Sequence, residues 1–174
     1  MFEHLAEHAI ILVTGPQRSG TTICARMIAH DTGHAYIDEA RFSVFNGKKA
    51  ITIAKACKPC VLQGPGLLKY AGYFGESGHL VVIMNRPNEE IAASLKDKRE
   101  LVRRLLDDYP DAKPLIEEHG LISLPRVMYA NFHANVMGRI PQDRLVGLWY
   151  EDLEEHPLWI DKEDRDGWKR RQWR

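Results

Sequence analysis

The sequence has few cysteines, no long apolar run and no excess charge of either sign, and each absence excludes a class of protein. Three cysteines among 174 residues, a small and odd number, make a poor disulfide framework. No apolar run reaches the roughly 20 residues of a membrane-spanning helix. Lys plus Arg and Asp plus Glu both total 24, so the charge gives no argument for nucleic acid or an anionic membrane as a partner.

Length and N-terminal composition predict one domain in the cytoplasm. A chain of 174 residues is long enough for one hydrophobic core, so we expect residues 1–174 to form a single domain. The first eight residues carry acids where a secretory signal would carry bases, which favours a cytoplasmic protein. The polar, tryptophan-rich segment 158–174 can be either packed against this domain or loose.

Apolar, strand-like runs alternate with helical patterns along the chain. The expected strands cover residues 9–13, 35–37, 60–63, 80–84 and 145–149. The expected helices cover residues 20–31, 48–57, 67–74 and 126–137, with a long helix that Asn88 caps and that extends past Leu105. This alternation predicts a three-layer α/β fold, with a central, mainly parallel five-stranded sheet and helices on both faces. Ligands bind such sheets beyond the carboxyl ends of the strands.

The most specific signal lies in residues 10–22, where an apolar run ends in a glycine turn that opens a helix. This is the architecture of a phosphate-binding loop. Gly15 and Gly20 keep the spacing of the ATP-binding pattern Gly-x-x-x-x-Gly-Lys-Ser/Thr. Thr22 keeps the hydroxyl of that pattern, but Thr21 stands where the lysine should be. We therefore expect an anion other than the triphosphate of ATP.

Arg18 places a positive charge inside the same loop, next to Ser19. The amides of residues 17–22 would point into one concavity at a helix N-terminus, and such a concavity binds an anion without further help. The alternative interpretation is an ordinary glycine turn between a strand and a helix. The coincidence of so many constrained positions favours the anion site.

Two further groups of residues follow the expected strands. Glu39 and Arg41 come just after the second strand, where a carboxylate can take a proton from an attacking hydroxyl. Arg86 ends the fourth strand and Ser94 lies eight positions later, so the two can meet at one phosphate, which suits the fork of an arginine. The alternatives are a solvated acidic loop for the first group, and an arginine in a salt bridge with an exposed serine for the second.

Metal chemistry has little support in the sequence. Cys57 and Cys60 have CxxC spacing, but they precede a strand instead of opening a helix, and no second ligand pair for zinc is evident. The eight histidines are scattered. We therefore expect ordinary thiols and no metal site.

Several segments resemble the P-loop sulfotransferases, which use 3′-phosphoadenosine 5′-phosphosulfate (PAPS). Residues 14–22 resemble the 5′-phosphosulfate loop of that family, and residues 81–94 resemble its 3′-phosphate segment. Residues 148–157 are similar to its Tyr-Glu-Asp-Leu segment, and residues 166–169 to its C-terminal Gly-x-Trp-Lys element. The Glu-x-Arg element at residues 39–41 is similar to that of the tyrosylprotein branch.

The resemblance implies a sulfotransferase that moves a sulfuryl group from PAPS to a hydroxyl or amine on a small-molecule or peptide acceptor. The mechanism it implies requires no metal, and the zero net charge and short apolar runs predict no nucleic-acid or membrane partner. Glu39 would be the catalytic base, Arg18 would stabilise charge on the bridging oxygen, and Arg41 would assist at the substrate site. The residues expected to contact PAPS are Gly15, Arg18, Ser19, Gly20, Thr21, Thr22, Arg86 and Ser94.

Gln63 departs from the family pattern, because many members carry a catalytic lysine at the corresponding position of the strand covering residues 60–63. A glutamine at the substrate can donate a hydrogen bond to a sulfuryl oxygen but carries no charge. The chain is also shorter than typical members, which implies trimmed acceptor-binding elements. Either activity is reduced or another group substitutes for the lysine.

Two other functions remain open at this level. A small P-loop nucleotide or metabolite kinase would also place an acid after the second strand, but it needs the lysine that reaches the β- and γ-phosphates. A catalytically degenerate nucleotide-binding protein would keep the anion pocket and lose turnover, in line with Gln63.

Overall fold

The computed structural model describes residues 1–42 and 47–159, and a five-stranded parallel sheet forms the centre of this part of the chain. Its strands are β1 (Ile10–Thr14), β2 (Ala35–Ile37), β3 (Cys60–Gln63), β4 (Leu80–Asn85) and β5 (Leu145–Trp149). Every hydrogen-bonded pair of strands is parallel, in the order β2-β3-β1-β4-β5. The five strands expected from the apolar runs are confirmed, with ends that shift by one residue in β1 and β4.

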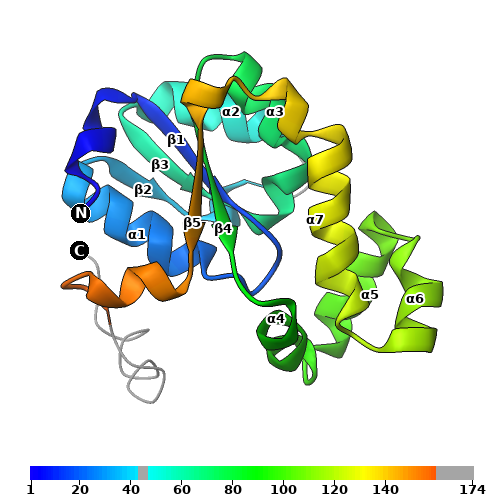
Figure 1. Cartoon of the computed structure of the whole chain (residues 1–174). Helices are drawn as coiled ribbons and strands as arrows, with labels where there is room; N and C mark the ends of the chain where they lie inside the picture. The colour runs from blue at the N-terminus through cyan, green and yellow to red at the C-terminus, as the bar shows by residue number, and fades with distance from the viewer. Residues whose placement is uncertain (43–46, 160–174) are drawn as a thin grey trace.

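Helices cover both faces of the sheet, which confirms the expected three layers (Figure 1). The helices are α1 (Thr21–Thr32), α2 (Gly47–Cys57), α3 (Ala71–Glu76), α4 (Asn88–Leu95), α5 (Arg99–Asp108), α6 (Ala112–His119) and α7 (Ser123–Asn135). Strand β1 shows how side chains are divided between the layers. Ile11 and Val13 pack with α1, whereas Ile10 and Leu12 pack with α2, α3 and α7.

Short 3₁₀ turns complete the layer that holds α1. They are η1 (Glu3–Glu7) near the N-terminus and η6 (Glu151–Glu155) after β5. Leu5 and Leu153 are the buried residues of these turns, and both belong to the same apolar cluster as α1. Helices α5 and α6 lie at the far end of the molecule, against α7 (Figure 1). Among the described residues, no helix combines the length and the apolar character needed to cross a membrane.

The prediction of one long helix starting at Asn88 is wrong, because the chain forms two helices in this region. Helix α4 ends at Leu95, and α5 begins at Arg99. Lys98 leaves the helical region with φ −112° and ψ 51°, while its N–H donates to Leu95 O at 2.8 Å, a tight turn that ends α4. Asn88 is the first residue of α4 and makes no capping hydrogen bond. The break matters because it faces the pocket described below.

Two other helical segments differ from expectation. The expected helix over residues 67–74 is a 3₁₀ turn, η3 (Pro65–Tyr70), that runs into α3. The region after Pro110, where no helix was predicted, contains α6. Pro114 lies in the first turn of α6, where its missing N–H would have no intrahelical partner in any case.

Candidate functional site

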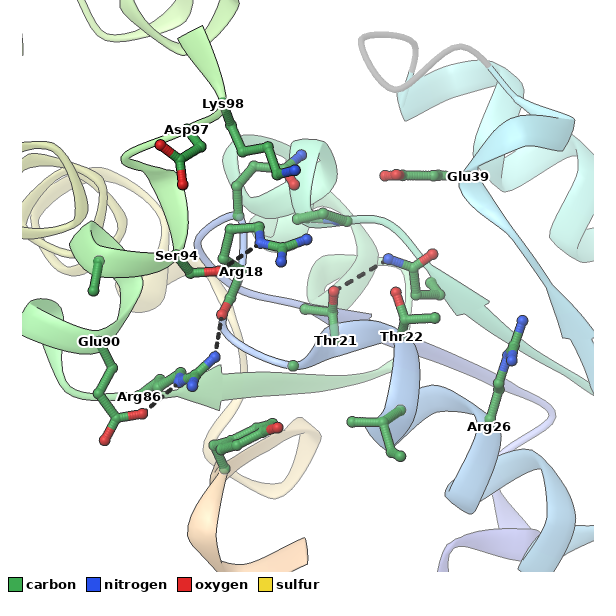
Figure 2. A pocket seen from close by; sticks show the side chains of 17 residues that line it. Arg18, Thr21, Thr22, Arg26, Glu39, Arg86, Glu90, Ser94, Asp97 and Lys98 are labelled. Carbon is green, nitrogen blue, oxygen red and sulfur yellow. Dashed lines mark hydrogen bonds and ion pairs between the residues drawn. The ribbon is translucent and has the colours of Figure 1, made fainter. Parts of the chain in front are cut away.

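A pocket of about 920 Å³ opens where β1, β3 and β4 end, at the edge where parallel sheets bind ligands. Its walls come from the loop between β1 and α1, from the end of β3 and from α4 with its junction to α5 (Figure 2). The charged side chains on these walls are Arg18, Arg26, Glu39, Arg86, Glu90, Asp97 and Lys98. The pocket therefore offers both signs of charge, with a basic side along the loop.

The β1–α1 loop has a strained backbone at Arg18. Its φ is +74°, and within the described ranges it is the single non-glycine residue with a positive φ. A non-glycine residue in this region costs about 1–2 kcal/mol. Gly20 precedes α1 with φ +96°, and Thr14 Oγ1 donates to Gly64 O at 2.8 Å, which ties the start of the loop to the end of β3. Such strain, held in place by neighbouring contacts, is typical of functional sites.

Arg18, Arg86 and Ser94 lie together, although they come from three separate elements. The Nε of Arg18 donates to Ser94 Oγ at 2.8 Å, and Nη1 of Arg86 donates to the backbone oxygen of Arg18 at 3.0 Å. Arg86 also pairs with Glu90, with Nε to Oε2 at 2.9 Å (Figure 2). The structure thus brings together the arginine and the serine that the sequence placed eight positions apart.

Two tyrosines hold this group in place. Tyr129, from α7, donates to Met84 O at 3.1 Å and accepts from Arg86 N at 3.2 Å, which fixes the end of β4. Burial raises the pKa of Tyr129 to about 12, so the phenol remains a donor at neutral pH. The guanidinium carbon of Arg86 lies 4.3 Å from the ring centroid of Tyr150, a cation–π contact.

Gly20→Ala is expected to lower the free energy of unfolding by about 2–4 kcal/mol, because alanine adds both backbone strain and overlap. A Cβ at Gly20 would lie 2.8 Å from Cε2 of Tyr150 and closer still to Cδ2. Chemical denaturation measures the loss. Gly78→Ala is the matched control, with φ +78° and nothing within 4 Å of the added Cβ, so it should cost only about 1–2 kcal/mol. Equal losses in both variants would contradict the contact with Tyr150.

Glu39 stands across the pocket from Arg18, with its carboxylate pointing into the space between them (Figure 2). It opens the 3₁₀ turn η2 (Glu39–Arg41), which Asp38 caps by accepting from Ala40 N at 2.9 Å. Tyr36 donates to the same Asp38 carboxylate at 2.9 Å. Burial, and then the charge of Asp38, raise the pKa of Glu39. Its Oε2 is buried and has no hydrogen-bond partner among the described residues. A carboxylate in this state is suited to accept a proton.

The remaining expected site residues occupy different positions. Thr21 and Thr22 line the pocket, as does Gln63, whose Nε2 donates to Thr21 Oγ1 at 3.1 Å. Gly15 and Ser19 belong to the loop but are buried and do not line the pocket. Arg41 is exposed and is not part of the lining, so the structure does not bring it to Glu39 in the pocket.

Sequence reasoning missed several residues at this site, among them Arg26, Glu90, Lys98 and Tyr150 on the pocket wall and Tyr129, which bonds to the backbone of Arg86. Tyr150 lies in the segment similar to the Tyr-Glu-Asp-Leu element, which was a usable signal. The sequence pattern places Lys98 on an exposed basic face of one long helix. In the structure it lies at the break between α4 and α5, and there its side chain lines the pocket. The sulfotransferase-like element at residues 166–169 lies outside the described residues.

A second cluster, His30, Asp31 and His156, lies at the other end of α1, with its possible ligand atoms within 4.8 Å of one another. The N–H of Leu158 donates to Nδ1 of His156 at 3.0 Å. Nε2 of a neutral His156 must then carry the proton, and it lies 3.1 Å from Asp31 Oδ1. A metal-binding nitrogen must be unprotonated, so the hydrogen bonds favour a structural link over a metal site. Cys24, Cys57 and Cys60 are free thiols.

Comparison with known proteins gives a likeness in fold. No protein-family model and no curated protein matches the sequence. Among solved structures, a shikimate kinase from Acinetobacter baumannii in complex with shikimate is similar, with a TM-score of 0.53 and 15% sequence identity. The match covers 85% of this chain and 87% of that chain. The chain therefore has an α/β fold of the P-loop type, as the sequence predicted.

Proposed function

We propose that the protein is a sulfotransferase that moves a sulfuryl group from PAPS to a hydroxyl or amine of a small-molecule or peptide acceptor. One observation carries the proposal. Arg18, Arg86 and Ser94 form a hydrogen-bonded group beside a phosphate loop that has Thr21 at its lysine position. Two guanidinium groups suit a donor with separate 5′ and 3′ anions, because each can pair with two oxygens of one anion.

The chemistry needs only groups that already line the pocket. The loop amides would hold the 5′-phosphosulfate, and Arg86 with Ser94 would hold the 3′-phosphate. Glu39 would take the proton of the acceptor as its oxygen or nitrogen forms a bond to sulfur. The bond between sulfur and the bridging oxygen then breaks, its electron pair stays on that oxygen, and Arg18 stabilises the resulting charge. A sulfuryl group carries less charge than a phosphoryl group, so this route does not require Mg²⁺.

A small-molecule kinase is the second candidate, and the fold shared with a shikimate kinase favours it. Such an enzyme would use the loop for ATP and the space near Glu39 for an acceptor hydroxyl. Thr21 argues against it, because P-loop kinases use the lysine of that position at the β- and γ-phosphates.

Ligand-dependent melting separates the two candidates. 3′,5′-ADP, the product of PAPS, is expected to stabilise the protein without metal, by about 2.7 kcal/mol at a concentration of 100 Kd. The control ligand is 5′-AMP, which lacks the 3′-phosphate and should stabilise less. A shift with ATP and Mg²⁺, and none with 3′,5′-ADP, would identify a kinase instead.

Transfer itself is measured with radiolabelled PAPS and a panel of hydroxyl and amine acceptors. Labelled product supports the enzyme. Binding of 3′,5′-ADP without any transfer would point to a nucleotide-binding protein that has lost turnover.

A further inference from the structure

We propose that Lys98 is a catalytic residue that supplies the positive charge that Gln63 lacks. The proposal rests on the sulfotransferase function above. Lys98 belongs to neither the loop nor β3, but to the junction between α4 and α5, and its side chain lines the pocket.

Gln63 stands at the position where many members of the similar family carry a catalytic lysine, and its side chain is hydrogen-bonded to the loop. Gln63 Nε2 donates to Thr21 Oγ1 at 3.1 Å, and both residues are buried. Neither side chain carries a charge, and one donor of the Gln63 amide is already used. A transferred sulfuryl group in the pocket would therefore meet the guanidinium of Arg18 from the loop but no ammonium from β3.

The backbone places Lys98 firmly on the opposite wall. Its N–H donates to Leu95 O at 2.8 Å, and its carbonyl oxygen accepts from Val102 N at 2.9 Å. The residue is thus fixed by the end of α4 on one side and the first turn of α5 on the other. Figure 2 shows its side chain extending from this junction toward the loop, on the side of Arg18, with Glu39 across the space.

The charge of Lys98 is available for a ligand. Among the described residues, Lys98 makes no ion pair, whereas Arg103 and Arg104 of α5 both pair with Glu100. A flexible ammonium beside a cavity, close to Arg18, suits an oxygen that gains charge during a reaction.

The proposed step assigns each atom and charge. The acceptor oxygen bonds to sulfur and its proton passes to Glu39. The bond from sulfur to the bridging oxygen breaks, and the electron pair remains on the departing 3′,5′-ADP. Lys98 and Arg18 contact that bridging oxygen from two sides and stabilise its charge.

Lys98→Met in the full chain tests the proposal, with Lys96→Met as the matched control. Lys96 is exposed on the same junction but does not line the pocket. Lys98→Met is expected to lower kcat with PAPS about 10- to 100-fold, and Lys98→Arg to recover part of the loss. Lys98→Ala should regain rate when ethylammonium is added, but not with sodium at the same ionic strength. A purely structural role would not respond to the added amine.

The outcomes separate this inference from the function on which it rests. If the wild type transfers sulfate and both variants keep the wild-type rate, the role of Lys98 is overturned and the sulfotransferase stands. If both variants lose the same amount of rate, the loss reflects the surface charge in general, and the role of Lys98 is again overturned. A wild type that transfers nothing from PAPS overturns the proposed function, and the role of Lys98 with it.

Discussion

Arg18→Ala is expected to lower kcat/KM for PAPS about 10²–10³-fold, the effect of losing one donor at a developing oxyanion. Arg18 is the single cation inside the β1–α1 loop, and the Arg86 hydrogen bond to its backbone oxygen survives the substitution. The loss should therefore come from the missing guanidinium and not from a collapsed loop. Steady-state rates with PAPS varied at a saturating acceptor concentration measure it. An unchanged rate would remove Arg18 from the mechanism.

Arg18→Gly separates this catalytic role from stability. Glycine adopts φ +74° without the cost that a side chain incurs there, which offsets the greater freedom of the unfolded glycine chain. We expect a free energy of unfolding within about 1 kcal/mol of the wild type, together with the full loss of rate. A large loss of stability in this variant would mean that the Arg18 side chain, through Ser94, is needed for the fold.

Glu39→Gln is expected to lower kcat about 10²–10⁴-fold, because glutamine keeps the shape of the side chain but cannot take a proton. In the wild type, the base must be ionised, and burial with the charge of Asp38 raises its pKa above the usual value for a glutamate. The rate should therefore fall as pH decreases through that raised pKa. In Glu39→Gln this acid limb should disappear from the pH profile, and a retained limb would assign the base to another group.

The same substitution should raise stability at neutral pH. A carboxyl with a raised pKa in the folded state binds more protons when folded than when unfolded. The free energy of unfolding therefore falls as pH rises from the unfolded-state pKa to the folded-state pKa, and it stays at the lower level above that pH. Removing the charge removes this cost. The control is Glu117→Gln on the exposed surface of α6, which should change neither the rate nor the stability noticeably. A destabilised Glu39→Gln variant would contradict the unpartnered state of this carboxylate.

The sheet and its loop could be predicted because their signals are local. Strand β1 is buried along its whole length and reads as an unbroken apolar run, and the glycines that close it have φ values that other residues rarely adopt. The positions of Arg86 and Ser94 followed from the strand end and the helical spacing. These features depend on a few neighbouring residues and on the rule that parallel strands end at one edge.

The α4–α5 break could not be predicted, because the charge and apolar pattern continues through it. The sequence places Lys96 and Lys98 on an exposed basic face of one helix, whereas in the structure α4 ends at Leu95 and the α5–α6 segment lies beside α7 (Figure 1). Arg41 failed to reach the pocket wall for a similar reason. A position after a strand locates the backbone, but the 3₁₀ turn that follows decides where the side chain points.

The contact between Gly20 and Tyr150 joins the first loop of the site to a residue that is synthesised much later. The loop is complete in sequence at Thr22, yet its glycine packs against a ring supplied more than a hundred residues later, after the last strand. The N–H of Tyr150 also donates to Asn85 O at 2.9 Å, which closes the end of β4. During synthesis from the N-terminus, the loop can therefore make this contact only after β5 and Tyr150 have been added to the chain. A nascent chain that ends before β5 carries every residue of the loop and lacks the ring that seats both Gly20 and Arg86.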